Sequence, residues 1–437
     1  MSDWSLQSGG DGGGSAGPEP AGGAVPRVTA VVVTWNRVAT VRRLLGDLPV
    51  QRAVLDGRCV LDVVVVDNAS EDGTAQTLHE EHPASRRVDN RAASGRGAVF
   101  TRAMGHLYAM PEPDEPGLTI VRNRRNLGGS GGFNTGLAWV YAQAERPEFV
   151  WLIDDDARLP EDALDEMLSV MTADRTVGLV GSRTVDIGDR VSPVESTIYF
   201  DRSTGFMRDR PPPGHAMHGA HLGWESAPDR APAGVEVDRF SGSIDVDVVS
   251  ACSMLCRWEA AEAVGPWDES FFLYCDDADW CLRVRSAGWR VVCCLGARVF
   301  HAPWHTKLTP VRDYYAKRNA VWMHRHALGG LELRRLSIRW PVWLAKESVR
   351  QWRAGRRMNA WMTARAMLDA TLDRGGPLPD RGRGTEPSKL SFLGMLVVSF
   401  GLAAAAAPWV RARRVPAWAG RGGTGSSGGT GSGGGAS

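Results

Sequence analysis

Phe149-Val150-Trp151-Leu152-Ile153-Asp154-Asp155-Asp156 joins an apolar strand pattern to three consecutive carboxylates. Neighbouring carboxylates repel one another, so their clustering indicates that a cation shares the charge. Because alternate residues of an extended segment point the same way, Asp154 and Asp156 can bind one ion while Asp155 faces elsewhere. A hard cation such as Mg²⁺ or Mn²⁺ suits carboxylates together with phosphate oxygens. An acidic turn that caps a helix beginning at Pro160 is the alternative interpretation.

Three further strand patterns precede this stretch, and a polar or glycine-rich segment follows each of them. They are Val28–Val33 before Thr34-Trp35-Asn36-Arg37, Leu61–Val66 before Asp67-Asn68-Ala69-Ser70, and Thr119–Arg122 before Asn126-Leu127-Gly128-Gly129. Ligands of an open α/β sheet bind beyond the carboxyl ends of its strands, so the polar clusters are expected to converge on one crevice. The glycine-rich segment lacks the spacing of a dinucleotide fingerprint. Its small residues favour a close approach of a sugar or phosphate, and the helical pattern from Leu137 to Ala144 follows it.

In this order, the residues resemble family 2 inverting glycosyltransferases of the GT-A fold, from about Arg27 to His326. The resemblance implies an α/β fold with a mostly parallel central sheet, helices on both faces and a C-terminal helical region. It implies a D-x-D metal site at Asp154 and Asp156, and nucleotide binding by the segment Thr34 to Arg37 and by Asp67. The full set assigned to the donor is Thr34, Asn36, Arg37, Asp67, Asn126, Gly128, Gly129, Asp154, Asp155, Trp304 and Arg318.

The second half of the chain supplies candidates for the catalytic base. Val248–Leu255 resembles the acceptor-side strand of the family, and the pattern Asp277-x-Asp279-Trp280 resembles the start of its base helix. An inverting transfer needs one base that takes the proton of the acceptor hydroxyl, and the resemblance assigns this role to Asp277, with Asp276 as the near alternative. Adjacent acids should raise one another's pKa. Asp276 and Asp279 can equally be acids that the helix dipole favours.

Two later segments complete the predicted site. His301 follows a strand pattern and resembles the third metal ligand of related enzymes, whereas the role of His305 stays open. Tyr314 to Asn319 resembles a Tyr-x-x-x-Arg-Asn segment of bacterial members. Arg318 within it is expected either to neutralise the leaving diphosphate or to brace the fold through an ion pair.

Length and composition agree with a large globular enzyme. The chain has 437 residues, of which 43% are hydrophobic, and a net charge of +1, which is no nucleic-acid signature. The odd number of cysteines, seven, and a glycine-rich start without a signal peptide pattern predict a protein of the reducing cytosol. The cysteine spacings do not predict a zinc site. The predicted organisation is a disordered tail over 1–25, the GT-A domain over 26–326 with an insertion or acceptor loop over 186–245, a basic Trp-rich helical region over 327–385, an apolar helix over 386–414 and a disordered tail over 415–437.

The C-terminal third predicts contact with a membrane. Arginines and lysines interleave with tryptophans between Arg334 and Trp361, as suits an anionic membrane surface, although a helical bracket packed on the catalytic domain has the same composition. Leu390–Val410 contains no charge and is long enough to cross about 30 Å of hydrocarbon, or to lie at the surface. The protein is therefore expected at the cytoplasmic side of the plasma membrane, peripheral or with a single span.

These features together predict a metal-dependent inverting glycosyltransferase that acts on a lipid-linked or cell-envelope glycan acceptor. The resemblance to galactofuranosyl and rhamnosyl transferases implies UDP-galactofuranose or dTDP-rhamnose as the donor, and no residue distinguishes the two. A non-catalytic glycan-binding scaffold and a sugar nucleotidylyltransferase are the alternatives. The second would need a basic, glycine-rich triphosphate loop after the first strand, and Thr34-Trp35-Asn36-Arg37 is not one.

Overall fold

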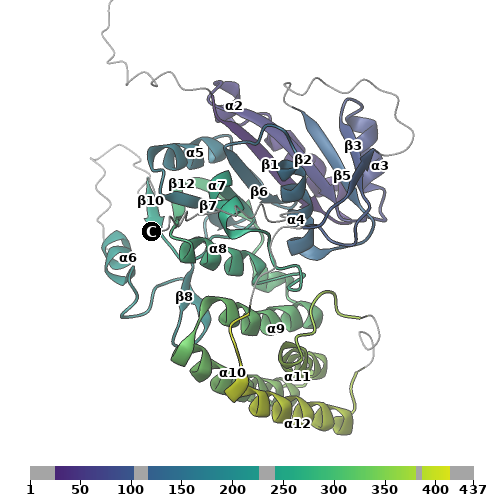
Figure 1. Cartoon of the computed structure of the whole chain (residues 1–437), viewed down its shortest axis with the longest axis vertical. Helices are drawn as coiled ribbons and strands as arrows, with labels where there is room; N and C mark the ends of the chain where they lie inside the picture. Colours follow the sequence, from purple (N-terminus) through teal and green to yellow (C-terminus); the bar gives the residue numbers. More distant parts are fainter. Residues whose placement is uncertain (1–24, 103–116, 226–241, 380–385, 414–437) are drawn as a thin grey trace, which may run out of the picture.

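The computed structural model describes residues 25–102, 117–225, 242–379 and 386–413 (Figure 1). A part built around a large sheet lies above a layer of four helices, α9 to α12, along the long axis of the molecule. The tails predicted over 1–25 and 415–437 lie outside the described residues, except for Val25.

A ten-stranded sheet in the order β10-β12-β7-β11-β6-β1-β2-β5-β3-β4 forms the upper part. Its strands are β1 (Arg27–Thr34), β2 (Val60–Asp67), β3 (Arg86–Asn90), β4 (Phe100–Arg102), β5 (Leu118–Asn123), β6 (Phe149–Asp154), β7 (Val177–Asp186), β10 (Ser243–Asp245), β11 (Ser253–Arg257) and β12 (Arg290–His301). Neighbouring strands are parallel except where β4, β10 and β11 pair. The prediction of a mostly parallel α/β sheet is confirmed, and the four strands expected from the sequence are β1, β2, β5 and β6.

Helices surround the sheet and continue below it. They are α1 (Val38–Asp47), α2 (Arg52–Leu55), α3 (Thr74–Glu81), α4 (Gly128–Tyr141), α5 (Ala163–Ala173), α6 (His218–Glu225), α7 (Trp258–Val264), α8 (Asp276–Ser286), α9 (Pro310–Ala327), α10 (Gly330–Arg353), α11 (Arg357–Thr371) and α12 (Lys389–Ala406), with short 3₁₀ helices η1 (Trp304–Lys307) and η2 (Ala407–Trp409). The C-terminal helical region that was predicted is therefore present as α10 to α12, and α9, which falls within the range predicted for the GT-A domain, lies in the same layer.

Both faces of the sheet are buried because its central strands are apolar at nearly every position and successive side chains point to opposite faces. In β1, Val31 joins one core together with Leu137 of α4, whereas Ala30 and Val32 join the opposite core together with Leu44 of α1. Near-continuous apolar strands are what a sheet covered on both faces requires.

Helix α4 begins at Gly128, earlier than the apolar pattern from Leu137 predicts. Its glycines let it lie close to β1, because a Cβ on Gly132 would come within 2.4 Å of Val33 Cγ1, and one on Gly136 within 2.2 Å of Val31 Cγ1. The glycine-rich segment is thus mainly a packing surface of the helix, and only its first residues reach the edge of the sheet.

The register of the parallel strands brings their carboxyl ends to one level. Thr34 at the end of β1 pairs with Asp67 of β2, and Val33 pairs with Asp154 of β6. This alignment places the predicted polar clusters along the same edge of the sheet.

The insertion predicted over 186–245 is more regular than its composition indicates. Its described part contains β8 (Tyr199–Asp201), β9 (Phe206–Arg208), α6 and β10. His221 is buried, and its Nδ1 lies 2.9 Å from the Tyr199 hydroxyl, while His215 Nε2 lies 2.8 Å from Asp247 Oδ2. His221 thus holds two parts of the insertion together, and His215 connects the insertion to the segment between β10 and β11.

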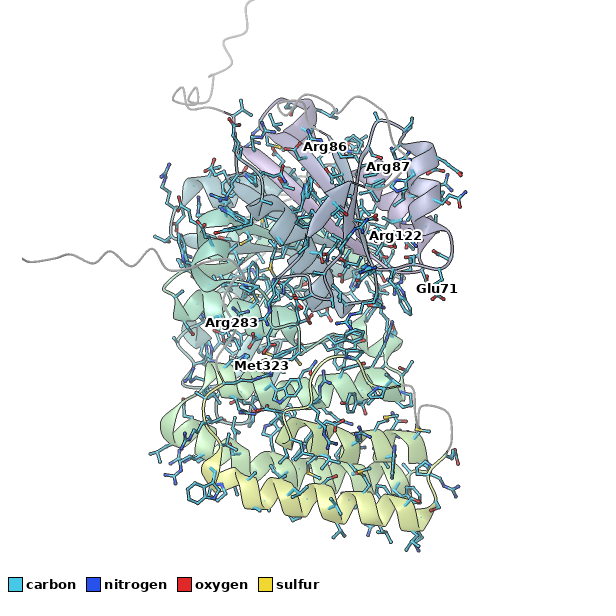
Figure 2. All side chains as sticks on the ribbon, turned by 45° about the vertical axis from the view of Figure 1, so that its right-hand side comes forward. Glu71, Arg86, Arg87, Arg122, Arg283 and Met323 are labelled. Atoms are coloured by element: carbon cyan, nitrogen blue, oxygen red, sulfur yellow. The ribbon has the colours of Figure 1, made fainter. Side chains whose placement is uncertain are left out.

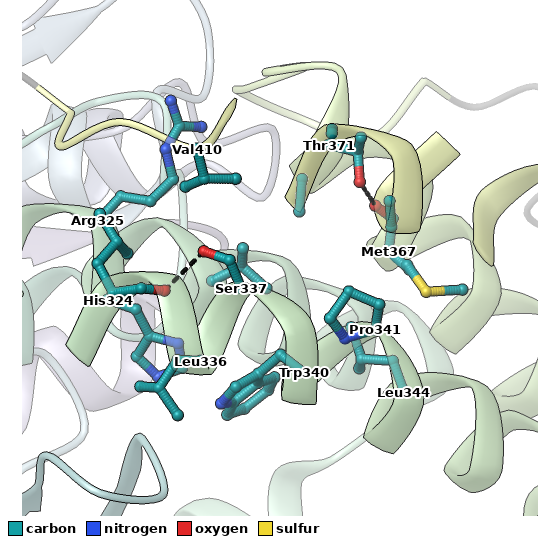
Figure 3. A pocket seen from close by; sticks show the side chains of 15 residues that line it. His324, Arg325, Leu336, Ser337, Trp340, Pro341, Leu344, Met367, Thr371 and Val410 are labelled. Atoms are coloured by element: carbon teal, nitrogen blue, oxygen red, sulfur yellow. Dashed lines mark hydrogen bonds between the residues drawn. The ribbon is translucent and has the colours of Figure 1, made fainter. Parts of the chain in front are cut away.

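The lower helices form a layer that is joined tightly to the sheet. Figure 2 shows Arg283 of α8 and Met323 of α9 at the junction of the two parts. Helices α10, α11 and α12 pack side by side, and the stretch Lys389–Trp409 is a helix long and apolar enough to cross a membrane. A mostly apolar pocket lies between α9 and α12 (Figure 3), lined among others by Trp340 and Leu344, and it contains none of the predicted site residues.

Candidate active site

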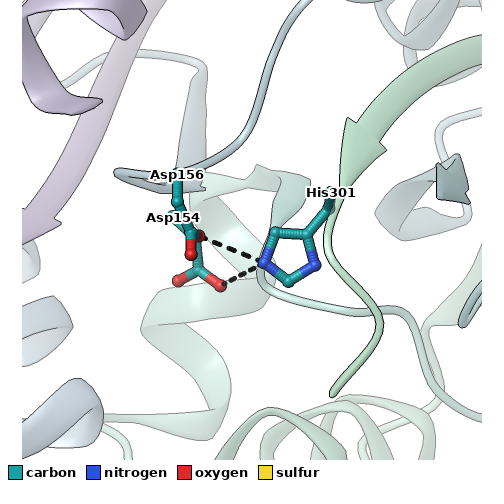
Figure 4. Close-up of side chains that lie close together, drawn as sticks. All are labelled: Asp154, Asp156 and His301. Carbon is teal, nitrogen blue, oxygen red and sulfur yellow. Dashed lines mark hydrogen bonds and ion pairs between the residues drawn. The ribbon is translucent and has the colours of Figure 1, made fainter. Parts of the chain in front are cut away.

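Asp154 and Asp156 at the end of β6 meet His301 at the end of β12 (Figure 4). His301 Nε2 lies 3.1 Å from Asp156 Oδ1 and 3.8 Å from Asp154 Oδ2. One ligand atom of each residue lies within 4.8 Å of the others, so one cation can contact all three. Two carboxylates and an imidazole suit Mn²⁺, and the carboxylates suit Mg²⁺. The residues therefore fit the predicted metal.

The charges around this trio (Asp154, Asp156 and His301) are strongly coupled. Burial disfavours ionised Asp156, but the hydrogen bond with His301 and the charges of Lys307 and Arg37 outweigh it and hold the Asp156 pKa well below its usual range. Burial likewise disfavours protonated His301, yet Asp156 and Asp154 raise the His301 pKa. A metal ion therefore competes with a proton at His301.

Asp155 faces the first strand, as the alternation of side chains predicts. The Thr34 hydroxyl donates to its Oδ2 at 2.7 Å, and Arg37 Nη1 donates to its Oδ1 at 2.8 Å and to Asp156 Oδ2 at 2.9 Å. Burial raises the pKa of Asp155 to about 6, with Arg37 offsetting part of the effect. Thr34 and Arg37 thus orient the aspartate run, in addition to any contact with the donor.

Asp67 lies fully buried at the end of β2, with one carboxylate oxygen short of partners. Its Oδ1 accepts from the Ser70 N–H at 3.1 Å, whereas Oδ2 has no hydrogen-bond partner among the described residues and lies 3.9 Å from Arg122 Nε. Burial raises the Asp67 pKa. A buried acceptor of this kind suits a donor group on a ligand. The neighbouring Asn36, at φ 53°, accepts from the Glu71 N–H at 2.7 Å and joins the two strand-end loops.

Asn126 and the first glycines of α4 connect the donor side to the loop before the base helix. Asn126 Oδ1 accepts from the Gly128 N–H at 2.8 Å and from Asn68 Nδ2 at 3.1 Å. Gly128 has φ 73°, and a Cβ there would lie 2.0 Å from the Phe272 carbonyl oxygen. A Cβ on Gly129 would lie 3.4 Å from Asp276 Oδ2. Glycine at 128 is therefore required by both backbone conformation and space.

Asp276 and Asp277 begin helix α8 and differ in how they are held. Asp276 is buried, and its Oδ2 accepts from the Ser130 hydroxyl at 2.8 Å. Asp277 is only partly buried, and the Ala251 N–H lies 3.5 Å from its Oδ2. Burial, followed by the charge of Asp276, raises the pKa of Asp277 to about 8, while burial raises that of Asp276 to about 6. The Ala278 N–H also donates to Asp277 Oδ1 at 2.7 Å. Asp277 thus has the greater proton affinity and the more exposed carboxylate. Asp279 belongs to a buried network with Arg283 and His326.

The loop before α8 has a strained backbone. Phe272, Tyr274 and Cys275 have φ of 66°, 69° and 60°, a region that non-glycine residues seldom occupy. Asn319 Nδ2 lies 2.9, 2.7 and 2.9 Å from the carbonyl oxygens of Phe271, Leu273 and Tyr274. The Asn319 amide therefore holds the loop that precedes the candidate base residues Asp276 and Asp277.

Arg318 lies beside Asn319 and is likewise buried. Its Nη2 donates to the carbonyls of Ser270 and Phe271 at 3.0 and 2.8 Å, and its Nη1 donates to the carbonyl of Gly376 at 2.9 Å. These contacts favour the interpretation that Arg318 braces the fold. Its partners are backbone carbonyl groups, whereas the sequence predicted an ion pair. Trp304, in η1, is 44% exposed, and the side chain of His305 lies outside the described residues.

Three charged residues of the site were not expected from the sequence. Glu195, at φ 50°, accepts from the Ser250 hydroxyl at 3.3 Å, and burial together with the charge of Asp154 raises its pKa, while His301 offsets part of the effect. Lys307 Nζ lies 2.9 Å from Asp156 Oδ2, and Arg312 Nη1 donates to the Lys307 carbonyl at 3.0 Å. A non-glycine residue at positive φ cannot be read from a sequence, but a lysine six residues after a candidate metal ligand is a signal that could have been used.

Residues 29–224 match the glycosyl transferase family 2 model. Galactofuranosyltransferase GlfT2 of Mycobacterium tuberculosis is 25% identical over 234 residues, which make up 52% of this chain and 36% of that protein, so the aligned part spans about a third of the relative's length. Mannosyltransferase PcManGT of Pyrobaculum calidifontis, solved with GDP-Man and Mn²⁺, is 18% identical with a TM-score of 0.43 over 88% of this chain and 87% of that one. TarS of S. aureus is 13% identical with a TM-score of 0.44 over 87% of this chain and 55% of that one.

Proposed function

We propose, from the premise that residues 29–224 match the glycosyl transferase family 2 model and supply β2 to β7 of the mostly parallel sheet, that the protein is a metal-dependent inverting glycosyltransferase. It would move a sugar from a nucleoside diphosphate donor to an acceptor hydroxyl. The observation that carries the proposal is that one short segment contacts both the trio of Asp154, Asp156 and His301 and the candidate base Asp277. The Asp154 N–H donates to the Cys252 carbonyl at 3.4 Å, and the N–H of the preceding Ala251 lies 3.5 Å from Asp277 Oδ2.

The donor would bind along the carboxyl ends of β1, β2 and β6. A divalent ion held by Asp154, Asp156 and His301 would neutralise the developing charge of the diphosphate. Asp67 Oδ2, which accepts no hydrogen bond from the described residues, suits a hydroxyl or N–H of the nucleoside, and Asn126 with Gly128 and Gly129 would line the sugar. Thr34 and Arg37 support the same site by fixing Asp155.

Asp277 would act as the base. Its carboxylate takes the proton of the acceptor hydroxyl while that oxygen bonds to the anomeric carbon and the bond to the diphosphate oxygen breaks. Its raised pKa supports this role, because a stronger base gains more from accepting the proton. Asp276 is the weaker candidate, since it is buried and its pKa is raised only to about 6.

The sugar and the acceptor belong to the finer part of the proposal. Galactofuranose or rhamnose is favoured, and the similarity to a galactofuranosyltransferase supports the first of the two. The acceptor would be a lipid-linked or cell-envelope glycan. The scaffold alternative would bind the donor without transfer, and the nucleotidylyltransferase alternative would require a triphosphate site that the loop after β1 does not offer.

We also propose that α12 docks the protein on the cytoplasmic side of the plasma membrane. Leu390, Val397 and Trp409 are 82%, 69% and 79% exposed, so the apolar helix turns a broad face away from the protein. Lys389 and Arg411 flank it, and exposed arginines of α10 lie on the neighbouring helix. An outward apolar face with basic neighbours suits an anionic bilayer.

Calorimetric titration with UDP and dTDP, first with Mn²⁺ and then with EDTA, tests the donor site. We expect one nucleotide to bind with Mn²⁺ and to bind about tenfold or more weakly with EDTA, because phosphate oxygens lose a shared cation. Asp156→Asn should reproduce the effect of EDTA. Equal binding in all conditions would contradict metal dependence, and no binding of either nucleotide would contradict the proposed donor.

A further inference from the structure

Lys307 contacts the atoms that are proposed to bind the metal. Its Nζ lies 2.9 Å from Asp156 Oδ2 and 2.9 Å from His301 Nε2. It is the last residue of η1, the short turn that connects β12 to α9, and its side chain is 21% exposed. Lys307 therefore places a positive charge against two members of the trio.

The contact with His301 conflicts with metal binding by the same atom. His301 Nε2 lies within hydrogen-bond distance of both Asp156 Oδ1 and Lys307 Nζ, and it cannot coordinate a cation while it either carries a proton toward Asp156 or accepts a hydrogen bond from Lys307. Asp156 is similarly engaged, since its Oδ2 accepts from both Lys307 and Arg37 at 2.9 Å. A divalent ion can use the full trio only if Lys307 leaves His301.

The surroundings of Lys307 indicate where its ammonium would go. Arg312 donates to the Lys307 carbonyl, and its side chain also hydrogen bonds with Tyr274. Both cations lie at the N-terminal end of the 18-residue helix α9, whose dipole favours a negative group. Two basic side chains and a helix N-terminus beside the proposed metal site suit the diphosphate of a donor.

We propose that Lys307 occupies the trio before the metal ion binds and then moves its ammonium to the diphosphate of the donor. This inference rests on the proposed function. In the transfer, the acceptor oxygen bonds to the anomeric carbon, its proton passes to Asp277, and the electron pair of the broken bond stays on the diphosphate, where Lys307 neutralises it. Lys307 thus takes the neutralising role, which was one of the two that the sequence left open for Arg318.

The test compares the wild-type protein with Lys307→Met, a side chain of similar length that cannot donate. Titration with Mn²⁺ alone should give several-fold tighter binding to the variant, because no ammonium competes for His301. Titration with UDP and dTDP at saturating Mn²⁺ should give about tenfold weaker binding, because a charge-assisted contact is lost. The two effects have opposite signs, which a merely structural lysine does not produce.

Two further variants control the result. Lys346→Met removes an exposed lysine of α10 and should leave the affinities for Mn²⁺ and for the nucleotide unchanged. Lys307→Arg keeps the positive charge, so both affinities should lie closer to wild type than those of Lys307→Met. If Lys307→Met does not fold, Lys307→Gln replaces it. If Lys307→Met bound Mn²⁺ as tightly as the wild type or more tightly, while its nucleotide affinity stayed unchanged, the exchange would be overturned and the proposed function would stand. No Mn²⁺ binding by the wild type would overturn the metal site of the proposed function, and the exchange with it.

Discussion

At the scale of single residues, Asp277 and Asp276 are chemically similar but differently placed. Asp276 is buried and accepts from Ser130, whereas Asp277 is partly exposed. We expect Asp277→Asn to lower kcat by about 10²–10⁴-fold, because general base catalysis is lost, and to leave UDP or dTDP binding unchanged. Steady-state kinetics and titration measure the two effects. Full activity of the variant would identify another base, and loss of nucleotide binding would indicate a structural role.

The pH dependence of transfer is expected to follow the ionisation of the same two aspartates, Asp276 and Asp277. The pKa of Asp277 is raised to about 8 by burial and by the charge of Asp276, and the base is active only when ionised. The rate should therefore rise with pH up to about this value and level off above it. Asp276→Asn removes the neighbouring charge while keeping an oxygen for Ser130, so it should lower the Asp277 pKa and move the rise to lower pH. A profile of kcat/KM against pH measures this shift, and an unchanged profile would mean that another group limits the reaction.

At the scale of elements, the strained loop before α8 is held by α9. Asn319 donates to carbonyls of this loop, and Arg413, beyond α12, donates through Nη2 to the Ser270 hydroxyl at 2.6 Å. The position of the proposed base thus depends on helices far from it in sequence.

We expect Asn319→Asp to lower kcat increasingly as the pH rises, while the affinity for the nucleotide stays near wild type. A protonated aspartic acid can still donate to one carbonyl, whereas its ionised form is repelled by all of them. Kinetics at several pH values, beside melting curves, measure the effect. Asn359→Asp on α11 is the matched control. If kcat, nucleotide affinity and melting temperature fell together, Asn319 would support the fold in general.

At the scale of the whole molecule, α12 lies at the end opposite to α2 along the long axis (Figure 1). Only a narrow stripe of the helix, with Phe392, Ser399 and Ala403, is buried against the neighbouring helices. This arrangement suits a helix that lies in the plane of a membrane surface, since α10 and α11 beside it carry exposed charges that the hydrocarbon region would exclude.

We expect the double variant Val397→Glu, Val398→Glu to bind vesicles of anionic phospholipid about tenfold more weakly than the wild type, because carboxylates replace the inserted apolar face. Vesicle flotation measures the binding, which should also weaken with salt. Leu55→Glu, at α2, is the control because Leu55 is 67% exposed at the far end. If the wild-type protein did not float with the vesicles, membrane docking would be contradicted. If the bound protein resisted carbonate extraction, α12 would span the membrane. If the wild-type protein self-associated and the double variant did not, the partner of α12 would be a second copy of the chain.

The sequence by itself determined the sheet and the outline of the site. Strand patterns are local, so the runs that became β1, β2, β5 and β6 could be recognised, and parallel pairing then brought Asp67 and Asp154 to one edge. The meeting of Asp154, Asp156 and His301 was expected from motif order, and the structure brings these residues together. Whether they bind metal stays a prediction.

The tertiary structure alone decided how the remaining polar residues are used. The partners of Glu195 and Asn319 lie elsewhere in the chain, so no local signal indicates these contacts. Lys307 lies six residues after His301, but only the fold shows that it also contacts Asp156. Arg318 matched a motif but is surrounded by carbonyl groups, because the fold closes α9 over the loop of Ser270. Secondary structure follows from spacing along the chain, whereas the partner of a single charged group depends on which distant elements the folded core brings beside it.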